Sequence, residues 1–209
     1  MALTLSRRIL RFNFDPLWFG HPSRLADFGV VGLASADLPL RMDAANQALR
    51  SLGLSGRWCF NFDWMPGRLA LLSSAEADWV LPQLAVLALP EFRTLVVRRE
   101  ERDWIRSLPA AEFDGAAGVG DVFREQGEFR PSPGLVRDVR TGLRRYGAAL
   151  WLALGRGLGD AGMARMKLML DPTLEAPSVS LDETQSRLLY HGFASCIGPQ
   201  IEGEWSWLR

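Results

Sequence analysis

Apolar residues recur at helical spacing along much of this chain. Between Pro133 and Leu158 they fall every three or four residues, which puts them on one side of a helix. The same spacing, interrupted by the charged block RREERD, runs through Glu91–Leu108 and predicts an amphipathic helix that ends before Pro109. A further helix is predicted within Ala34–Leu54.

Two pairs of residues have the spacing of a capping box, in which a serine at the helix start is followed three residues later by a glutamate. Ser73 and Glu76 predict the start of one helix, which Pro82 would kink if the helix runs through it. Ser180 and Glu183 predict the start of the last helix, which ends before the Gly-Pro pair at 198–199.

Three segments have less regular patterns. Residues 56–65 alternate aromatic with polar or small side chains, which favours a short strand over an extended loop. Residues 163–170 fit a helix and a strand equally well, and the glycine-rich residues 110–134 are predicted to form a long surface loop. We therefore expect a mainly α protein, with 1–209 forming one compact multi-helix domain that has room for a few short strands.

The segment Arg11–Leu25, RFNFDPLWFGHPSRL, concentrates large aromatic side chains near the N-terminus. Its rings belong to Phe12, Phe14, Trp18 and Phe19. Because each ring can bury roughly 150–250 Å², we expect a fixed hook whose rings are buried within the domain. If the ring of Trp18 is fully buried, its replacement by alanine should cost roughly 3–5 kcal/mol.

The C-terminal tail GEWSWLR carries two further tryptophans, Trp205 and Trp207. Their alternation is typical of an extended segment with both rings on one side. Two interpretations stay open: the rings lock the C-terminus onto the core, or they form a hot spot for a partner.

The composition excludes several classes of protein. Twenty-four basic and twenty-four acidic side chains cancel, so no net field favours nucleic acid or an anionic membrane surface. The two cysteines are far apart and form no metal-binding motif, which predicts no zinc site, no disulfide framework and a reducing cytoplasm. No apolar run approaches the roughly 18–20 residues needed to span a bilayer, so we expect a soluble protein without direct membrane insertion.

The sequence contains little that predicts catalysis. His21 and His191 are the only histidines, and Cys196 lies five residues after His191, which does not place the two on one helix face. The stretch GRGLGD follows a helix and lacks the spacing of a phosphate-binding loop. We expect no catalytic, cofactor-binding or metal-binding residues.

Two arginine-rich stretches are candidates for binding a protein. The first is the mixed-charge surface of 98–103, and the second is the basic side of the helix over 137–145. Acidic residues in both stretches weaken an interpretation as a nucleic-acid site. The candidate protein-binding residues are Arg98, Arg99, Arg102, Arg137, Arg140 and Arg144.

Two segments resemble one known family. RFNFDPLWFGHPSRL resembles an early "LRF-P--Y-HP--L" pattern, and RTGLRRYGAALWLALG resembles a helix with a "GLAFWLA"-like core. Both patterns are those of the SctK family of type III secretion sorting-platform proteins. This chain departs from them in having Trp18-Phe19 where a tyrosine or leucine is expected and in its arginine-rich second helix, which leaves the branch of the family open.

The resemblance implies a non-catalytic cytoplasmic adaptor, peripheral at the inner-membrane secretion apparatus. Such a protein would bridge the cytoplasmic domain of an inner-membrane ring protein to a pod protein of the sorting platform. Two alternatives stay open. One is a secretion chaperone or regulatory binding protein, which a homodimer with an apolar groove would favour. The other is a small enzyme whose site is assembled from scattered residues.

Overall fold

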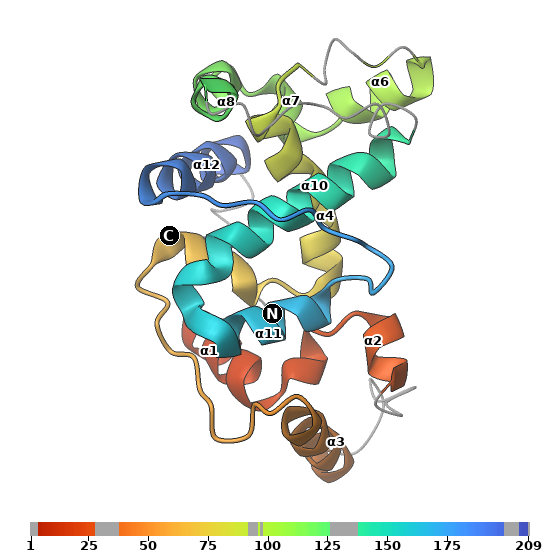
Figure 1. Ribbon diagram of the computed structural model, residues 1–209, viewed down its shortest axis with the longest axis vertical. Coiled ribbons are helices and arrows are strands. Elements are labelled where there is room, and N and C mark those ends of the chain that lie inside the picture. Colours follow the sequence, from red (N-terminus) through yellow and green to blue (C-terminus); the bar gives the residue numbers. More distant parts are fainter. Residues whose placement is uncertain are drawn as a thin grey trace. The chain divides into compact units, whose positions relative to one another are not determined.

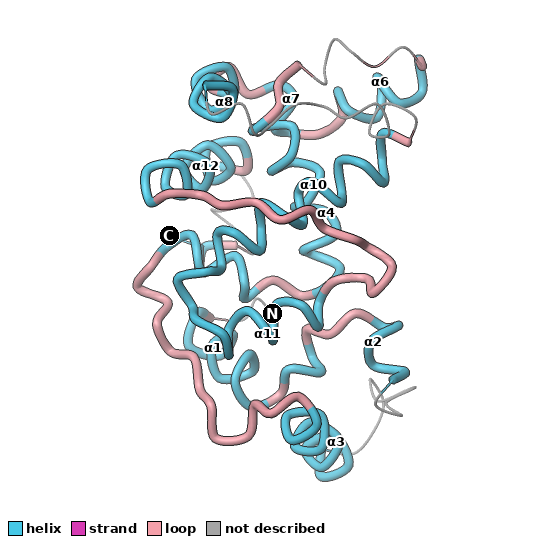
Figure 2. Tube along the Cα trace, in the orientation of Figure 1, coloured by secondary structure: helices cyan, strands magenta, loops and turns pink. Residues whose placement is uncertain are grey.

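The computed structural model describes residues 4–27, 38–91, 96, 98–125, 138–198 and 205–208. Within these ranges every regular element is a helix, so the mainly α fold class is confirmed (Figures 1 and 2). The chain forms two compact units, Met1–Ala77 with Gly155–Leu174 and Asp78–Leu154 with Glu175–Arg209. The assignment of residues 1–209 to one domain stays a prediction.

Unit 1 contains short helices around a core of aromatic rings. Phe12 contacts Phe19 and Phe62 edge-on, at ring-centroid distances of 6.3 and 5.5 Å. The elements of this unit are α1 (Leu5–Phe14), η1 (Pro16–Trp18), α2 (Pro22–Asp27), α3 (Leu38–Ser51), η3 (Met65–Leu71), η4 (Gly155–Leu158), α11 (Gly159–Met169) and the first turn of α4 (Ser74–Ala88).

The predicted aromatic hook is a helix followed by two short helical turns, and only part of it is buried. Phe12 and Phe19 are fully buried, whereas Phe14 and Trp18 are 39% and 44% exposed. Side chains two residues apart on a helix point in nearly opposite directions, so burying Phe12 turns Phe14 outward. The prediction that all the rings of the hook are buried is therefore wrong, and the cost given for a buried Trp18 does not apply.

Residues 57–63 form an irregular extended segment and not the short strand that alternation favoured. The segment is held by the side chain of Asn13. The side-chain nitrogen of Asn13 donates to the Cys59 carbonyl oxygen, and its side-chain oxygen accepts from the backbone amide of Cys59, both at 2.6 Å. One amide side chain thus substitutes for a neighbouring strand. The side chain of Cys59 itself is buried, and this burial raises the pKa of its thiol.

Arg165 of α11 lies next to this segment and is 1% exposed. Its guanidinium donates to the carbonyl oxygens of Ala161, Asn13 and Arg57 at 3.0, 3.4 and 2.9 Å. It forms no ion pair with a carboxylate in the part of the chain that the structure describes. Burial lowers the pKa of Arg165, in keeping with a charge held by carbonyl dipoles alone.

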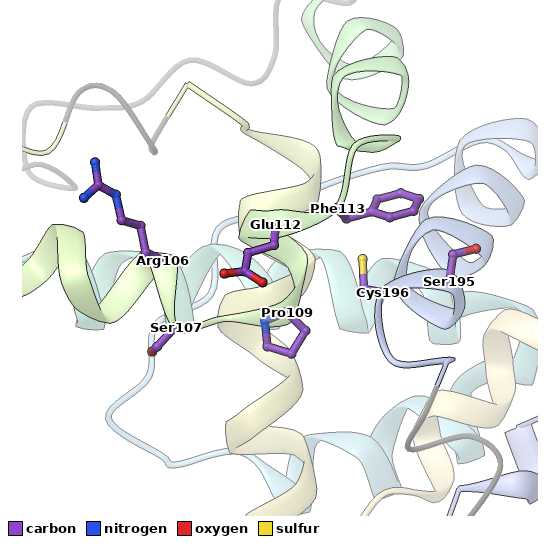
Figure 3. Close-up of a pocket in the computed structure, with 7 residues that line it drawn as sticks. All are labelled: Arg106, Ser107, Pro109, Glu112, Phe113, Ser195 and Cys196. Atoms are coloured by element: carbon purple, nitrogen blue, oxygen red, sulfur yellow. The ribbon is translucent and has the colours of Figure 1, made fainter.

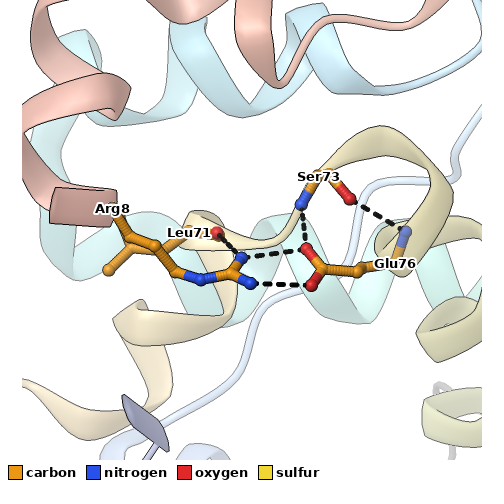
Figure 4. A network of polar contacts seen from close by, with 4 residues as sticks. All are labelled: Arg8, Leu71, Ser73 and Glu76. Atoms are coloured by element: carbon orange, nitrogen blue, oxygen red, sulfur yellow. Dashed lines mark hydrogen bonds and ion pairs between the residues drawn. The ribbon is translucent and has the colours of Figure 1, made fainter. Parts of the chain in front are cut away.

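The predicted capping box at the start of α4 is confirmed. The Ser73 amide donates to the Glu76 carboxylate at 2.6 Å, and the Glu76 amide donates to the Ser73 hydroxyl at 3.3 Å. The same carboxylate forms a bidentate pair with Arg8, whose guanidinium also donates to the Leu71 carbonyl (Figure 4). A single carboxylate therefore connects α1 to the start of α4.

Unit 2 is built on α10, with shorter helices around it. Its elements are the rest of α4, α6 (Arg99–Arg106), α7 (Pro109–Glu112), α8 (Ala116–Glu125), α10 (Val139–Leu154), α12 (Glu183–Cys196) and η5 (Ser206–Leu208). α12 packs against α7 and α8, and α6 packs against α7.

α10 and α4 approach each other closely at a glycine (Figure 1). A Cβ atom built on Gly147 would lie 1.8 Å from the Leu81 carbonyl oxygen, far inside van der Waals contact. The close approach requires glycine at this position, because a larger side chain would collide with the backbone of α4. α4 also continues through Pro82.

Several predicted boundaries in unit 2 need correction. Among the described residues, the helix predicted over Glu91–Leu108 is α6, which begins after the extended backbone of Arg98 and ends at Arg106; residues 92–95 and 97 of that prediction lie outside the described residues. The predicted loop over 110–134 contains the last residues of α7 and all of α8, where Val119 and Phe123, one turn apart, are both buried. Residues 126–134 of that loop lie outside the described residues.

The last two helices also refine the predictions. Residues 163–170, left open between helix and strand, belong to α11 up to Met169. The final helix is present, but its capping box is formed by Asp182 and Gln185 and not by Ser180 and Glu183. Aspartate and glutamine can occupy the same two roles, which shifts the start by two residues.

The C-terminal tryptophans are buried, which supports the locking interpretation. Trp205 packs edge-on against Trp79, with ring centroids 5.3 Å apart, and also contacts Phe193. The Tyr190 hydroxyl donates to the Leu208 carbonyl. Ser206–Leu208 is a helical turn, so the expected extended geometry is wrong although the rings dock as expected.

Replacing Glu76 by alanine is expected to lower the free energy of unfolding by about 3 kcal/mol, because the buried Arg8 charge loses its partner. Asp103→Ala, which removes an exposed ion pair with Arg99, should cost less than about 0.5 kcal/mol. Chemical denaturation of both variants measures the difference. Equal losses would contradict a supporting role for the Arg8–Glu76 pair.

The Glu76 pair also predicts a pH dependence. Burial alone would raise the pKa of Glu76, but hydrogen bonds from Arg8 and Ser73 outweigh it and hold the pKa below its ordinary value of 4.5. The stabilisation is therefore complete above about pH 4.5 and is lost as the pH falls through the lower folded-state pKa. The stability difference between the wild type and Glu76→Gln should shrink in that range.

Gly147→Ala is expected to destabilise the protein by about 3 kcal/mol or more, because the new methyl group collides with the backbone of α4. The matched control is Gly118→Ala in α8, where an added Cβ meets nothing within 4 Å. That change should stabilise by about 0.5–1 kcal/mol through helix propensity. Thermal unfolding of the two variants distinguishes a close helix contact from a general intolerance of alanine.

Candidate protein-binding surfaces

The predicted mixed-charge surface at 98–103 forms the start of α6 and is exposed. Arg98 lies 3.8 Å from Glu101, and Arg99 lies 3.7 Å from Asp103. The Arg99–Asp103 pair is exposed and contributes little to stability, so its charges stay available to a partner, whereas the Glu101 side chain is only 17% exposed. Arg102 is exposed as well.

The basic side of α10 meets α6 at one tryptophan. The guanidinium of Arg140 lies over the ring of Trp104, 5.2 Å from its centroid. Asp138 precedes α10 and accepts a hydrogen bond from the Thr141 amide at 3.2 Å, an interaction with Thr141 that holds the pKa of Asp138 below its ordinary value. We call Trp104 and Arg140 the Trp104–Arg140 surface.

The other predicted residues are arranged differently. Arg144 forms an ion pair with Asp78 on α4 at 2.5 Å, and both side chains are partly exposed. Its neighbour Arg145 donates to the Glu175 carbonyl at 2.8 Å. Arg137 lies outside the described residues. Arg102 precedes Trp104 by two residues, so it leaves α6 from another side.

A hollow of about 390 Å³ lies between α7 and the end of α12 (Figure 3). Its lining includes one thiol, that of Cys196, one carboxylate, that of Glu112, and the guanidinium of Arg106. The Cys196 thiol lies 3.0 Å from the Gly192 carbonyl of its own helix. No histidine lines the hollow, so it holds no cysteine–histidine pair for nucleophilic catalysis.

The two histidines have different surroundings. The backbone amide of His21 donates to the Leu168 carbonyl at 2.9 Å, and its Nδ1 accepts from the Ser23 amide at 3.3 Å, which caps the start of α2. His191 is exposed and lies edge-on to Tyr190. Among the described residues no group of three or more histidine, cysteine, aspartate or glutamate side chains is arranged to hold a metal ion.

A second exposed surface was missed by reasoning from the sequence. It consists of apolar side chains of α1, η1 and the 57–63 segment, which the sequence analysis assigned to the buried hook or left undecided. We call it the aromatic surface, and its members are Leu10, Phe14, Trp18, Trp58 and Phe60. A helical period read over residues 5–14 would have shown that Phe12 and Phe14 cannot share a face.

No helix in the described ranges combines the length and apolar character required to cross a bilayer. Comparison with protein-family models, with curated proteins and with solved structures finds no match to this chain.

The ion pair of Arg144 with Asp78 is expected to stabilise unit 2 modestly. A double-mutant cycle with Arg144→Ala and Asp78→Ala should give a coupling energy of about 0.5–1 kcal/mol. The pair of Arg187 and Glu183, which is more exposed, should give a coupling close to zero. The same small coupling energy for both pairs would show that the Arg144–Asp78 ion pair contributes no more to stability than an exposed ion pair does.

Proposed function

We propose that the protein is a non-catalytic adaptor of a type III secretion injectisome. In this proposal it binds the cytoplasmic domain of an inner-membrane ring protein and a pod protein of the sorting platform. It acts in the cytoplasm, peripheral at the inner membrane. The proposal starts from the resemblance of Arg11–Leu25 and Arg140–Gly155 to the SctK family.

Both resembling segments build helices that carry core residues. The first contributes Phe12 and Phe19 to unit 1, and the second contributes Leu150 and Trp151 to unit 2, all fully buried. A resemblance in such residues concerns the fold more than the chemistry. This supports a shared architecture, and the adaptor role has to be argued from the surface.

The observation that carries the adaptor role is the Trp104–Arg140 surface. Tryptophan and arginine are the residue types most enriched at the energetic centres of protein interfaces. Here they come from two helices, and exposed charges of both signs on α6 lie close to Trp104 in sequence. Mixed charge of this kind suits a protein partner and gives register to the complex.

The surroundings of the histidines also agree with a non-catalytic role. His21 is engaged in capping a helix through its ring nitrogen, so that lone pair is not available to activate a nucleophile. The hollow beside Cys196 offers a thiol with no histidine among its lining residues.

Arg140→Glu is expected to weaken capture of one partner by at least about tenfold, because it reverses the charge beside Trp104. The assay uses the full-length chain with the purified ring-protein cytoplasmic domain and, separately, the pod protein from the same bacterium. Arg144 is left unchanged, because reversing it would place two carboxylates together at Asp78 and lower stability.

The control variant is Arg50→Glu, an exposed helical arginine in unit 1. It should leave capture unchanged, and both variants should keep the wild-type unfolding temperature within a few degrees. Normal capture by Arg140→Glu would rule out the Trp104–Arg140 surface. Failure of the wild-type protein to bind either partner would rule out the adaptor function itself.

A further inference from the structure

One side of α1 is exposed and combines apolar with basic side chains. Arg7, Leu10, Arg11 and Phe14 occupy positions i, i+3, i+4 and i+7 of the helix, so they lie on a common face. The opposite face buries Arg8 and Phe12. Leu10 is 51% exposed, although leucine on a core-facing helix would normally be covered.

The 57–63 segment extends this face. Trp58 and Phe60 are 46% and 55% exposed, whereas Cys59 between them is buried. The rings of Phe14 and Trp58 pack with their centroids 4.6 Å apart. The two hydrogen bonds between Asn13 and Cys59 fix the neighbouring positions, so this ring pair is held in place before any partner arrives.

Trp18 of η1 continues the surface next to Arg11. The guanidinium of Arg11 lies 3.8 Å from the centroid of its ring, a close cation–π contact. Phe14 follows Arg11 on the same face of α1 and contacts Trp58, so the row runs from Trp18 to the 57–63 segment. Exposed apolar side chains gathered in this way mark interaction sites more often than scattered ones do.

The charges around the aromatic surface are mainly positive. α1 carries no acidic residue, and Arg7, Arg11 and Arg57 form no ion pair with a carboxylate in the part of the chain that the structure describes. Residues 4–18 and 57–63 hold one acidic residue each, Asp15 and Asp63. A partner that covers the rings would therefore gain from carboxylates placed opposite the arginines.

We propose that the aromatic surface binds an acidic amphipathic helix of a partner protein. The apolar side of that helix covers the exposed rings and Leu10, and its carboxylates pair with Arg7 and Arg57. This interaction does not depend on the proposed secretion role, and it uses unit 1, whereas the Trp104–Arg140 surface belongs to unit 2.

The arrangement of the rings favours a helix over a nucleic acid or a membrane. Single-stranded nucleic acid stacks its bases on open ring faces, but Phe14 and Trp58 face each other, and Arg11 covers a face of Trp18. The neutral charge of the chain gives no long-range attraction to phosphates or anionic lipids. A broad apolar face with a basic edge suits an amphipathic helix that lays its apolar side on the rings.

The test uses three synthetic helical peptides of about 18 residues, or five turns. All have the same leucine and phenylalanine face, flanked by glutamate, glutamine or lysine. Fluorescence anisotropy of each labelled peptide is measured with the full-length protein. The glutamate peptide should bind at least about tenfold more tightly than the lysine peptide, and Arg7→Glu with Arg57→Glu should reverse that order.

A second variant tests the apolar contribution. Leu10→Ser with Phe60→Ser removes the two most exposed apolar side chains and should weaken the glutamate peptide by at least about tenfold. Met42→Ser changes another exposed apolar side chain, on α3, and should leave binding unchanged. Circular dichroism and unfolding curves confirm that each variant is folded.

Four outcomes would overturn the proposal. The first is equal affinity for the three peptides, and the second is glutamate-peptide binding that survives the Leu10 and Phe60 changes. The third is binding to a thymidine oligonucleotide, or to vesicles of phosphatidylcholine and phosphatidylglycerol, that those changes abolish. The fourth is self-association in sedimentation experiments that the same changes abolish.

Discussion

A buried guanidinium that pairs with no carboxylate of the described residues is the constraint on which unit 1 depends. Removing a charge from water costs several kcal/mol unless hydrogen bonds replace the lost hydration. Arg165 obtains them from three backbone carbonyls, one of which, at Asn13, belongs to the last turn of α1. Carbonyls at that end of a helix lack intrahelical donors and carry partial negative charge. One N–H group of the cation and one carbonyl at the helix end therefore satisfy each other, while the buried Nε of Arg165 has no hydrogen-bond partner among the described residues.

This arrangement connects the interior of unit 1 to its surface. The carbonyl of Asn13 accepts from Arg165 while its side chain holds Cys59, and the carbonyl of Arg57 accepts from the same guanidinium. The residues next in sequence to these anchors are Phe14 and Trp58, whose rings pack together at the surface. The placement of exposed aromatic side chains thus follows from buried polar contacts, and not from hydrophobic burial.

The sequence predicted those features that depend on neighbours along the chain. The apolar period of α10 and the capping box at Ser73 are local patterns, and the structure confirms them. The exposure of Trp18 and the extended geometry at Cys59 depend on residues far away in sequence, and no period encodes them. The candidate arginines were identified by type, but the ion pair of Arg144 with Asp78, 66 residues apart, needed the structure.

Neither unit is continuous in sequence, because each is made of two stretches of chain separated by part of the other. During synthesis the N-terminal residues leave the ribosome first, yet Arg165 follows only after most of unit 2 has been made. Until then the carbonyls of Asn13 and Arg57 lack their donor, and Phe12 lacks part of its cover. Unit 1 therefore cannot complete its fold before Arg165 has been synthesised. Until then the exposed rings of unit 1 lie next to a core that is only partly formed.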